Sequence, residues 1–212
     1  MQKTESLLAQ IRKTLPAKVK FKDESKFMKF LAFCMFFNKD FMTGYITTLG
    51  YTIFFPTRRW TEARDPWDIT AHEYIHMEQF RKNALQGVLY LFPQVLAVLS
   101  LLSLLAIWLS SWWLMSLLFL LTLAPLPAPW RMKYEMEGYS ADMAIEYWRH
   151  GSQMIDPGYV FSNAGYYWMW PFKKDVAKRI AAAKMSIANG DILRDARYKL
   201  IHDWVLDNWA KL

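Results

Sequence analysis

Two histidines and a glutamate near residue 75 have the types and spacing of a metal-dependent hydrolytic site. His72, Glu73 and His76 form the pattern His-Glu-x-x-His. Because four residues advance about 400° around a helix axis, the two imidazoles lie on one face of a helix and can bind one zinc ion. Glu73 lies beside them and can act as general base on the water that such an ion activates. The pattern therefore predicts zinc-dependent hydrolysis.

A catalytic zinc site of this kind still needs a third protein ligand, and it keeps a fourth position open for water or substrate. The chain has four histidines and a single cysteine, Cys34, so neither a cysteine-ligated zinc site nor an intrachain disulfide is available. The first carboxylates after a long apolar stretch are Glu135 and Glu137. Their side chains point about 200° apart on a helix, so spacing alone leaves both open as the third ligand.

Several signals place the histidines on a helix. Asp65 is the predicted N-cap and Pro66 the first helical residue, and the helix is expected to run to at least Lys82. Asp68 lies in the first turn, one turn before His72. It can accept the second N–H of that imidazole, or it can act only as an acid that favours the helix dipole.

Upstream of this helix, residues 45–55 read as β structure. Aromatic and β-branched side chains dominate the segment, and Pro56 ends it. It is either an ordinary hairpin with a packing role or an edge strand beside the metal. An edge strand in that position could bind an extended peptide by strand addition.

The chain contains no charged residue from position 83 to position 130. One membrane span needs about 20 apolar residues, so this block predicts two transmembrane helices, at 88–107 and 112–130, with a turn at Ser110-Ser111. The tryptophans around the turn suit a membrane interface. A hairpin that dips into one leaflet, or a very apolar core, is the alternative.

The predicted spans fix a topology. His72 and the downstream glutamates lie on opposite sides of the apolar block, so they meet at one ion only if the block crosses the membrane an even number of times or not at all. Lys and Arg flank the block on both sides, which favours a cytoplasmic location for both termini and for the active site. The expected localisation is an integral membrane protein with two spans, whose partner is the lipid bilayer.

Composition agrees with a membrane partner better than with nucleic acid. The net charge is +7, 54% of the residues are hydrophobic and 17% are aromatic. The basic residues are scattered and accompany no nucleic-acid motif, so no nucleic-acid partner is predicted. The oligomeric state cannot be inferred from these features.

The remaining sequence predicts helices at 131–150, 172–188 and 191–210, with an aromatic loop at 151–172. The fold class is therefore mainly α with a small β element, in which metal-binding helices are joined by a transmembrane helical hairpin. One integrated domain is expected in three parts: an N-terminal region with the edge strand and the histidine helix at 1–87, the hairpin at 88–130, and the third-ligand helix, aromatic loop and amphipathic helices at 131–212.

The segments His72-Glu73-Tyr-Ile-His76 and Glu135-Met-Glu137-Gly-Tyr together resemble the zincin metallopeptidases whose third ligand is a glutamate. These include the integral-membrane prenyl-protein endopeptidases and the heat-shock membrane peptidases. In that group the second helix reads Glu-x-x-Ala-Asp or Glu-x-Glu-Ala-Asp, and its first glutamate binds zinc. The resemblance implies a zincin-like fold with His72, His76 and Glu135 as ligands and Glu73 as general base.

This sequence departs from the family pattern in two ways. Gly138 and Tyr139 stand where the family has Ala-Asp, and the pair Ala141-Asp142 follows three residues later. That register favours Glu137 or Gly138 at the ligand position, so Glu137 is the runner-up.

The predicted function is a membrane-embedded zinc metalloendopeptidase that acts on peptides or membrane-associated proteins. A donor to the developing oxyanion is also required, and Tyr139, His150 and Tyr166 are the candidates. One alternative is a membrane di-iron carboxylate oxidoreductase, because Glu73-x-x-His76 also fits its Glu-x-x-His element. The other is a non-catalytic membrane adaptor with a degenerate metal site, anchored by the aromatic stretch 166–170 and the basic C-terminal helices.

Overall fold

The computed structural model describes residues 2–34, 38–151, 154–163 and 169–209. These residues are mainly helical with one small sheet, as the sequence predicted. They group into two compact units. The first contains residues 1–84, 138–155 and 183–212, and the second contains residues 85–137 and 156–182. Helix α6 (Pro129–His150) contributes its last turns to the first unit and its first turns to the second.

The sheet of the first unit has three strands in the order β1-β3-β2. Strand β3 (Thr52–Phe55) is central, because β1 (Lys18–Phe21) pairs with it in parallel and β2 (Thr47–Leu49) pairs with it antiparallel. Its apolar side chains are buried on both faces, as expected for a central strand. Gly50 turns the chain between β2 and β3 at φ 59°, which favours glycine. The prediction of β structure at 45–55 is confirmed, as a hairpin.

Three short helices come before, between and after these strands along the chain: α1 (Gln2–Ile11), α2 (Lys26–Cys34) and α3 (Arg58–Arg64). Asp65, the predicted N-cap of the next helix, instead ends α3 in the left-handed conformation, at φ 44°. Its carboxylate accepts hydrogen bonds from the backbone N–H groups of Lys3 and Thr4, at 3.0 and 2.9 Å. The N-cap prediction was wrong because this carboxylate satisfies free donors in the first turn of α1.

Helix α4 (Trp67–Lys82) carries the two histidines, and nearly every side chain from Thr70 to Gln79 is buried. It begins one residue later than predicted and ends at Lys82, as expected. Helix α8 (Ala196–Trp209) packs near its start, where the rings of Trp67 and Trp204 lie 5.2 Å apart. Because α4 is buried all round, polar side chains on every face of it must find partners within the protein.

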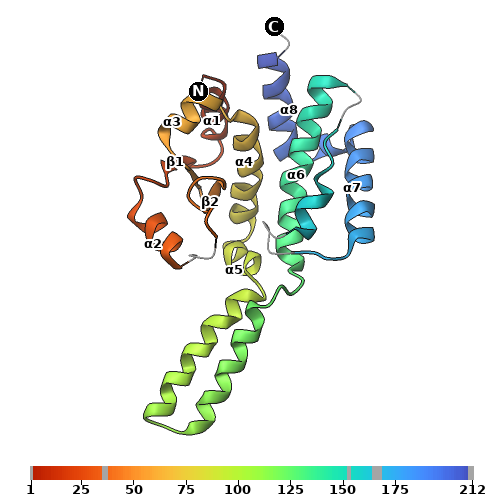
Figure 1. Cartoon of the computed structure of the whole chain (residues 1–212). Coiled ribbons are helices and arrows are strands. Elements are labelled where there is room, and N and C mark those ends of the chain that lie inside the picture. The colour runs from red at the N-terminus through yellow and green to blue at the C-terminus, as the bar shows by residue number, and fades with distance from the viewer. Residues whose placement is uncertain (1, 35–37, 152–153, 164–168, 210–212) are drawn as a thin grey trace. The chain divides into compact units, whose positions relative to one another are not determined.

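The second unit begins with the short helix α5 (Gln86–Tyr90) and continues into two 3₁₀ helices, η1 (Gln94–Ile107) and η2 (Ser111–Leu123). These two helices lie side by side as an antiparallel hairpin (Figure 1). Later in the chain come η3 (Pro157–Ser162) and α7 (Lys173–Ala188), and in the first unit η5 (Asp191–Arg194) precedes α8.

Within the described part of the chain, none of the helices combines the length and the apolar character needed to cross a membrane. The predicted spans at 88–107 and 112–130 were therefore wrong. So was the integral-membrane localisation derived from them, with two transmembrane helices and with termini and active site in the cytoplasm. Proline is the physical reason: Pro93 separates α5 from η1, and Pro125 follows the end of η2. The longer of the two 3₁₀ helices has 14 residues.

Candidate metal centre

The two histidines of α4 converge on each other. The Nε2 atoms of His72 and His76 lie 3.2 Å apart, and both side chains are buried. In a tetrahedral zinc site with Zn–N bonds of about 2.0–2.1 Å, two ligand nitrogens are about 3.3 Å apart. The spacing of the two imidazoles therefore suits a single bound ion.

The other nitrogen of each imidazole is already engaged by an acceptor. His72 Nδ1 lies 2.8 Å from Asp142 Oδ2, and His76 Nδ1 lies 2.9 Å from Gln79 Oε1. A carboxylate and an amide oxygen accept hydrogen bonds, so each Nδ1 carries the ring proton and each Nε2 of a neutral ring presents a lone pair. Two lone pairs facing each other at this distance need a metal ion or an additional proton between them. The histidine pair thus has the donor set of a metal site.

A carboxylate completes the group. Glu135 of α6 is buried, and its ligand atom and those of His72 and His76 all lie within 4.8 Å of one another. Within the described residues this group could hold a metal ion, and Glu137 is not a member of it. Side chains of Glu135 and Glu137 leave the helix about 200° apart, so the face that presents one turns the other away.

Gly138 explains how α6 comes so near the histidines. A Cβ atom at this position would lie 2.5 Å from His72 Nε2, closer than any side chain tolerates. Glu135 lies three residues earlier, and residues three apart share one face of a helix. Gly138 therefore leaves out a side-chain atom that would collide with the imidazole of His72.

The sequence analysis missed the partners that orient the imidazoles. It placed Asp68 as one possible partner of His72, but Asp142 takes that role, and Asp68 accepts a hydrogen bond from the N–H of Ile69 instead. Asp68 keeps only its alternative role as an acid in the first turn. The sequence contained one indication that Asp142 lies near the histidines. It follows Glu135 by seven residues, which is nearly two full helical turns, so the two side chains share one face of the helix. Gln79 offered a similar signal, three residues after His76.

Glu73, the predicted general base, is buried one turn before His76. The buried ammonium group of Lys22 interacts electrostatically with the Glu73 carboxylate. The Lys22 ammonium donates hydrogen bonds to the carbonyl oxygens of Phe41 and Tyr45, at 2.6 and 2.8 Å. Burial lowers the pKa of Lys22 to about 8, while the negative charge of Glu73 acts in the opposite direction and raises it. The first unit therefore places the Lys22 amine within electrostatic reach of Glu73.

The three predicted oxyanion donors have different surroundings. The ring of Tyr139 packs edge-on against the imidazole of His72, with the ring centroids 5.1 Å apart. His150 lies near the carboxylate of Glu146, at 3.7 Å, and is partly exposed. Tyr166 lies outside the described residues, as does most of the aromatic stretch 166–170. Of the three, the described structure brings Tyr139 to the histidines.

Strand β2 lies at an edge of the sheet and packs beside α4. It has one neighbour in the sheet, β3. At the turn that follows it, the ring of Tyr51 packs edge-on against Phe80 of α4 at 5.2 Å. The predicted edge strand next to the histidine helix is therefore present in the first unit.

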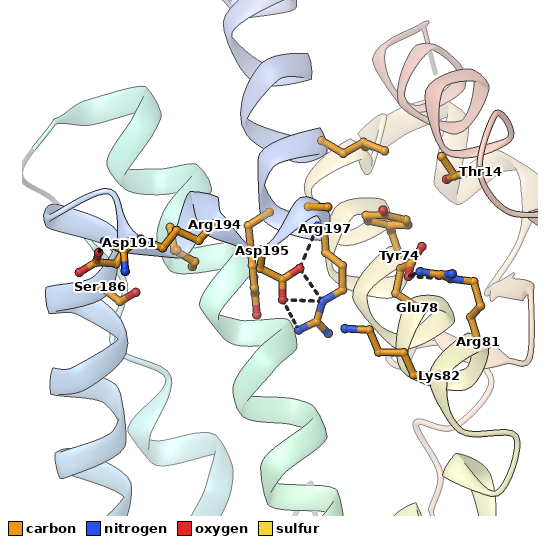
Figure 2. A pocket seen from close by; sticks show the side chains of 14 residues that line it. Thr14, Tyr74, Glu78, Arg81, Lys82, Ser186, Asp191, Arg194, Asp195 and Arg197 are labelled. Atoms are coloured by element: carbon orange, nitrogen blue, oxygen red, sulfur yellow. Dashed lines mark hydrogen bonds and ion pairs between the residues drawn. The ribbon is translucent and has the colours of Figure 1, made fainter.

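A cleft of about 930 Å³ lies on another face of α4 (Figure 2). Tyr74 and Glu78 line it, each two residues from a histidine, so they point about 200° away from the histidine face. Its charged side chains pair within the cleft, and the closest contacts are Arg81–Glu78 at 2.7 Å, Arg197–Asp195 at 2.7 Å and Arg194–Asp191 at 2.9 Å. The cleft thus offers volume but mostly neutralised charge, and neither histidine lines it.

Comparison of the chain with models of known families, with characterised proteins and with solved structures finds no match. The likeness to zincin metallopeptidases therefore rests on the motifs alone and stays a prediction.

Proposed function

We propose that this protein is a zinc-dependent metallopeptidase in which His72, His76 and Glu135 hold the ion. The observation that carries the proposal is the convergence of the two Nε2 atoms at 3.2 Å while both Nδ1 atoms face acceptors. Two neutral imidazoles and one carboxylate form a ligand set used by catalytic zinc, with a fourth position left for water or substrate. When bound, zinc would polarise the scissile carbonyl and lower the pKa of water.

Glu73 is the proposed general base. It takes a proton from the attacking water and passes it to the leaving amine. Asp142 and Gln79 hold the Nδ1 protons, so that each imidazole keeps the tautomer that binds a metal. Each of these roles belongs to a side chain that is buried or hydrogen-bonded, so the site is preorganised before a substrate arrives.

An extended peptide is the proposed substrate class. Among the described residues, β2 has a sheet neighbour on one side only, and an extended chain could add on its other side through main-chain hydrogen bonds. This mode recognises the peptide backbone and is tolerant of side-chain sequence.

The predicted di-iron alternative finds less support. Such sites use four carboxylates with two histidines, whereas the group found among the described residues has one carboxylate with two histidines. The non-catalytic alternative has the same metal site and differs only in the absence of hydrolysis, so an activity measurement separates it from the peptidase.

The test is cleavage of an unfolded protein substrate by the purified chain, measured with zinc, after chelation and after zinc is restored. Glu73→Gln should retain zinc and lose activity by about 10²–10⁴-fold, because it removes the base and keeps the ligands. Glu62→Gln, at an exposed position of α3, is the matched control and should keep full activity. Full activity of Glu73→Gln would refute the base, and zinc binding without hydrolysis by the wild type would favour a non-catalytic metal protein.

A further inference from the structure

Tyr90, the last residue of α5, hydrogen-bonds to the carboxylate that we assign to the metal. Its hydroxyl donates to Glu135 Oε1 at 2.6 Å, across 45 positions of sequence. The phenolic O–H is the donor of this contact and the carboxylate oxygen the acceptor. A hydrogen bond to an ionised acceptor is shorter and stronger than one between neutral groups. The contact is therefore a strong local constraint on Glu135.

Arg131 holds Tyr90 in turn. Its Nε donates to the carbonyl oxygen of Tyr90 at 3.1 Å, and its guanidinium lies 5.1 Å from the centre of the tyrosine ring. A second nitrogen of the same side chain reaches Gln94 Oε1 at 3.4 Å. Arg131 is buried and lies one helical turn before Glu135 on α6. The arginine thus fixes both the backbone and the ring face of the residue that contacts Glu135.

We propose that Tyr90 is a positioning residue for the metal ligand Glu135, an inference that rests on the proposed zinc site. By holding Oε1, the hydroxyl fixes the plane of the carboxylate. Glu135 would then be held in one orientation toward a bound zinc ion, which would supply the Lewis acidity. Carboxylate ligands of metals are commonly held by such hydrogen bonds.

Zinc affinity is the readout, measured by competition with a chelating dye, which does not depend on catalysis. Tyr90→Phe removes only the hydroxyl, and it should weaken zinc binding by about 10–100-fold, the usual effect of losing such a partner. Tyr159→Phe, at a largely exposed position, is the matched control and should bind zinc as the wild type does. Arg131→Met should weaken binding in the same direction but less, because it loosens Tyr90 without touching the carboxylate.

A double-mutant cycle distinguishes positioning from a general loss of structure. In a Glu135→Ala background, Tyr90→Phe should have no further effect on the remaining zinc affinity, because its partner is gone. An equal effect in both backgrounds, or unchanged affinity in Tyr90→Phe, would overturn the proposal. If the wild type binds no zinc, the proposed function fails as well. If the wild type binds zinc and Tyr90→Phe binds it equally well, only the role of Tyr90 fails.

Discussion

Two faces of helix α4 are equally buried but differ in how their polar groups are satisfied. On one face, Tyr74 and Glu78 line a cleft, and the Glu78 carboxylate is neutralised by Arg81. On the other face, His72 and His76 direct two nitrogen lone pairs at each other. A carboxylate from α6 joins the histidines. The two faces are alike in burial and polarity. They differ in their charged partners, because Glu78 forms an ion pair on one face and a carboxylate joins two histidines on the other.

The comparison shows why the presence of a cleft does not by itself indicate the functional face. The cleft has a volume of about 930 Å³, and its principal charges form ion pairs with one another. The histidine face has a donor set that a cation would complete. We therefore propose that the histidine face of α4 carries the function and that the cleft face has a structural role.

Among substitutions that test the difference between the two faces, Gly138→Ala should have the largest effect, which is a loss of zinc affinity at the histidine face. The new Cβ would lie 2.5 Å from His72 Nε2, so either the imidazole or α6 must move. We expect zinc affinity to fall by at least about 100-fold, the upper range for disturbing the surroundings of a metal site. Chelator competition measures it. Gly87→Ala is the matched control, because a Cβ there meets nothing within 4 Å. Wild-type affinity in Gly138→Ala would show that the close approach of α6 does not matter for the metal.

A substitution on the cleft face is expected to have a smaller effect, and to change the stability of the fold rather than zinc affinity. Glu78→Ala removes a buried carboxylate that accepts two hydrogen bonds from Arg81, at 2.9 and 2.7 Å. Because the Arg81 side chain is about half exposed and regains water, the free energy of unfolding should fall by only about 2 kcal/mol. Urea unfolding measures this loss. Zinc affinity should stay unchanged. A parallel loss of zinc affinity would mean that the two faces are not independent.

Local patterns predicted much of the fold, because they depend on neighbouring residues. The hairpin at 45–55 follows from β-branched and aromatic side chains around Gly50, and the histidine helix follows from its spacing and its charged ends. Sequence position left Glu135 and Glu137 open as the third ligand, and only the family resemblance favoured Glu135. The structure places it with the histidines, and its role in metal binding stays a proposal.

Predictions failed where a distant residue decides the outcome. Asp65 has the local setting of an N-cap, yet it satisfies the first turn of α1, which lies about sixty residues earlier in the chain. The partner of His72 is Asp142, seventy residues away. The apolar block met the compositional test for two spans, but Pro93 divides its helices and no described helix reaches the required length. Tertiary contacts and proline geometry decided these cases.

The central claim is that His72, His76 and Glu135 bind one zinc ion. X-ray absorption at the zinc edge of the wild-type chain, loaded with one equivalent of zinc and freed of excess metal, tests it most directly. We expect one retained zinc per chain with two imidazole nitrogens and oxygen ligands at about 2.0–2.2 Å. The signal of one imidazole should disappear in His76→Ala. Loss of zinc from the wild type during purification, or a coordination shell without imidazole, would contradict the claim.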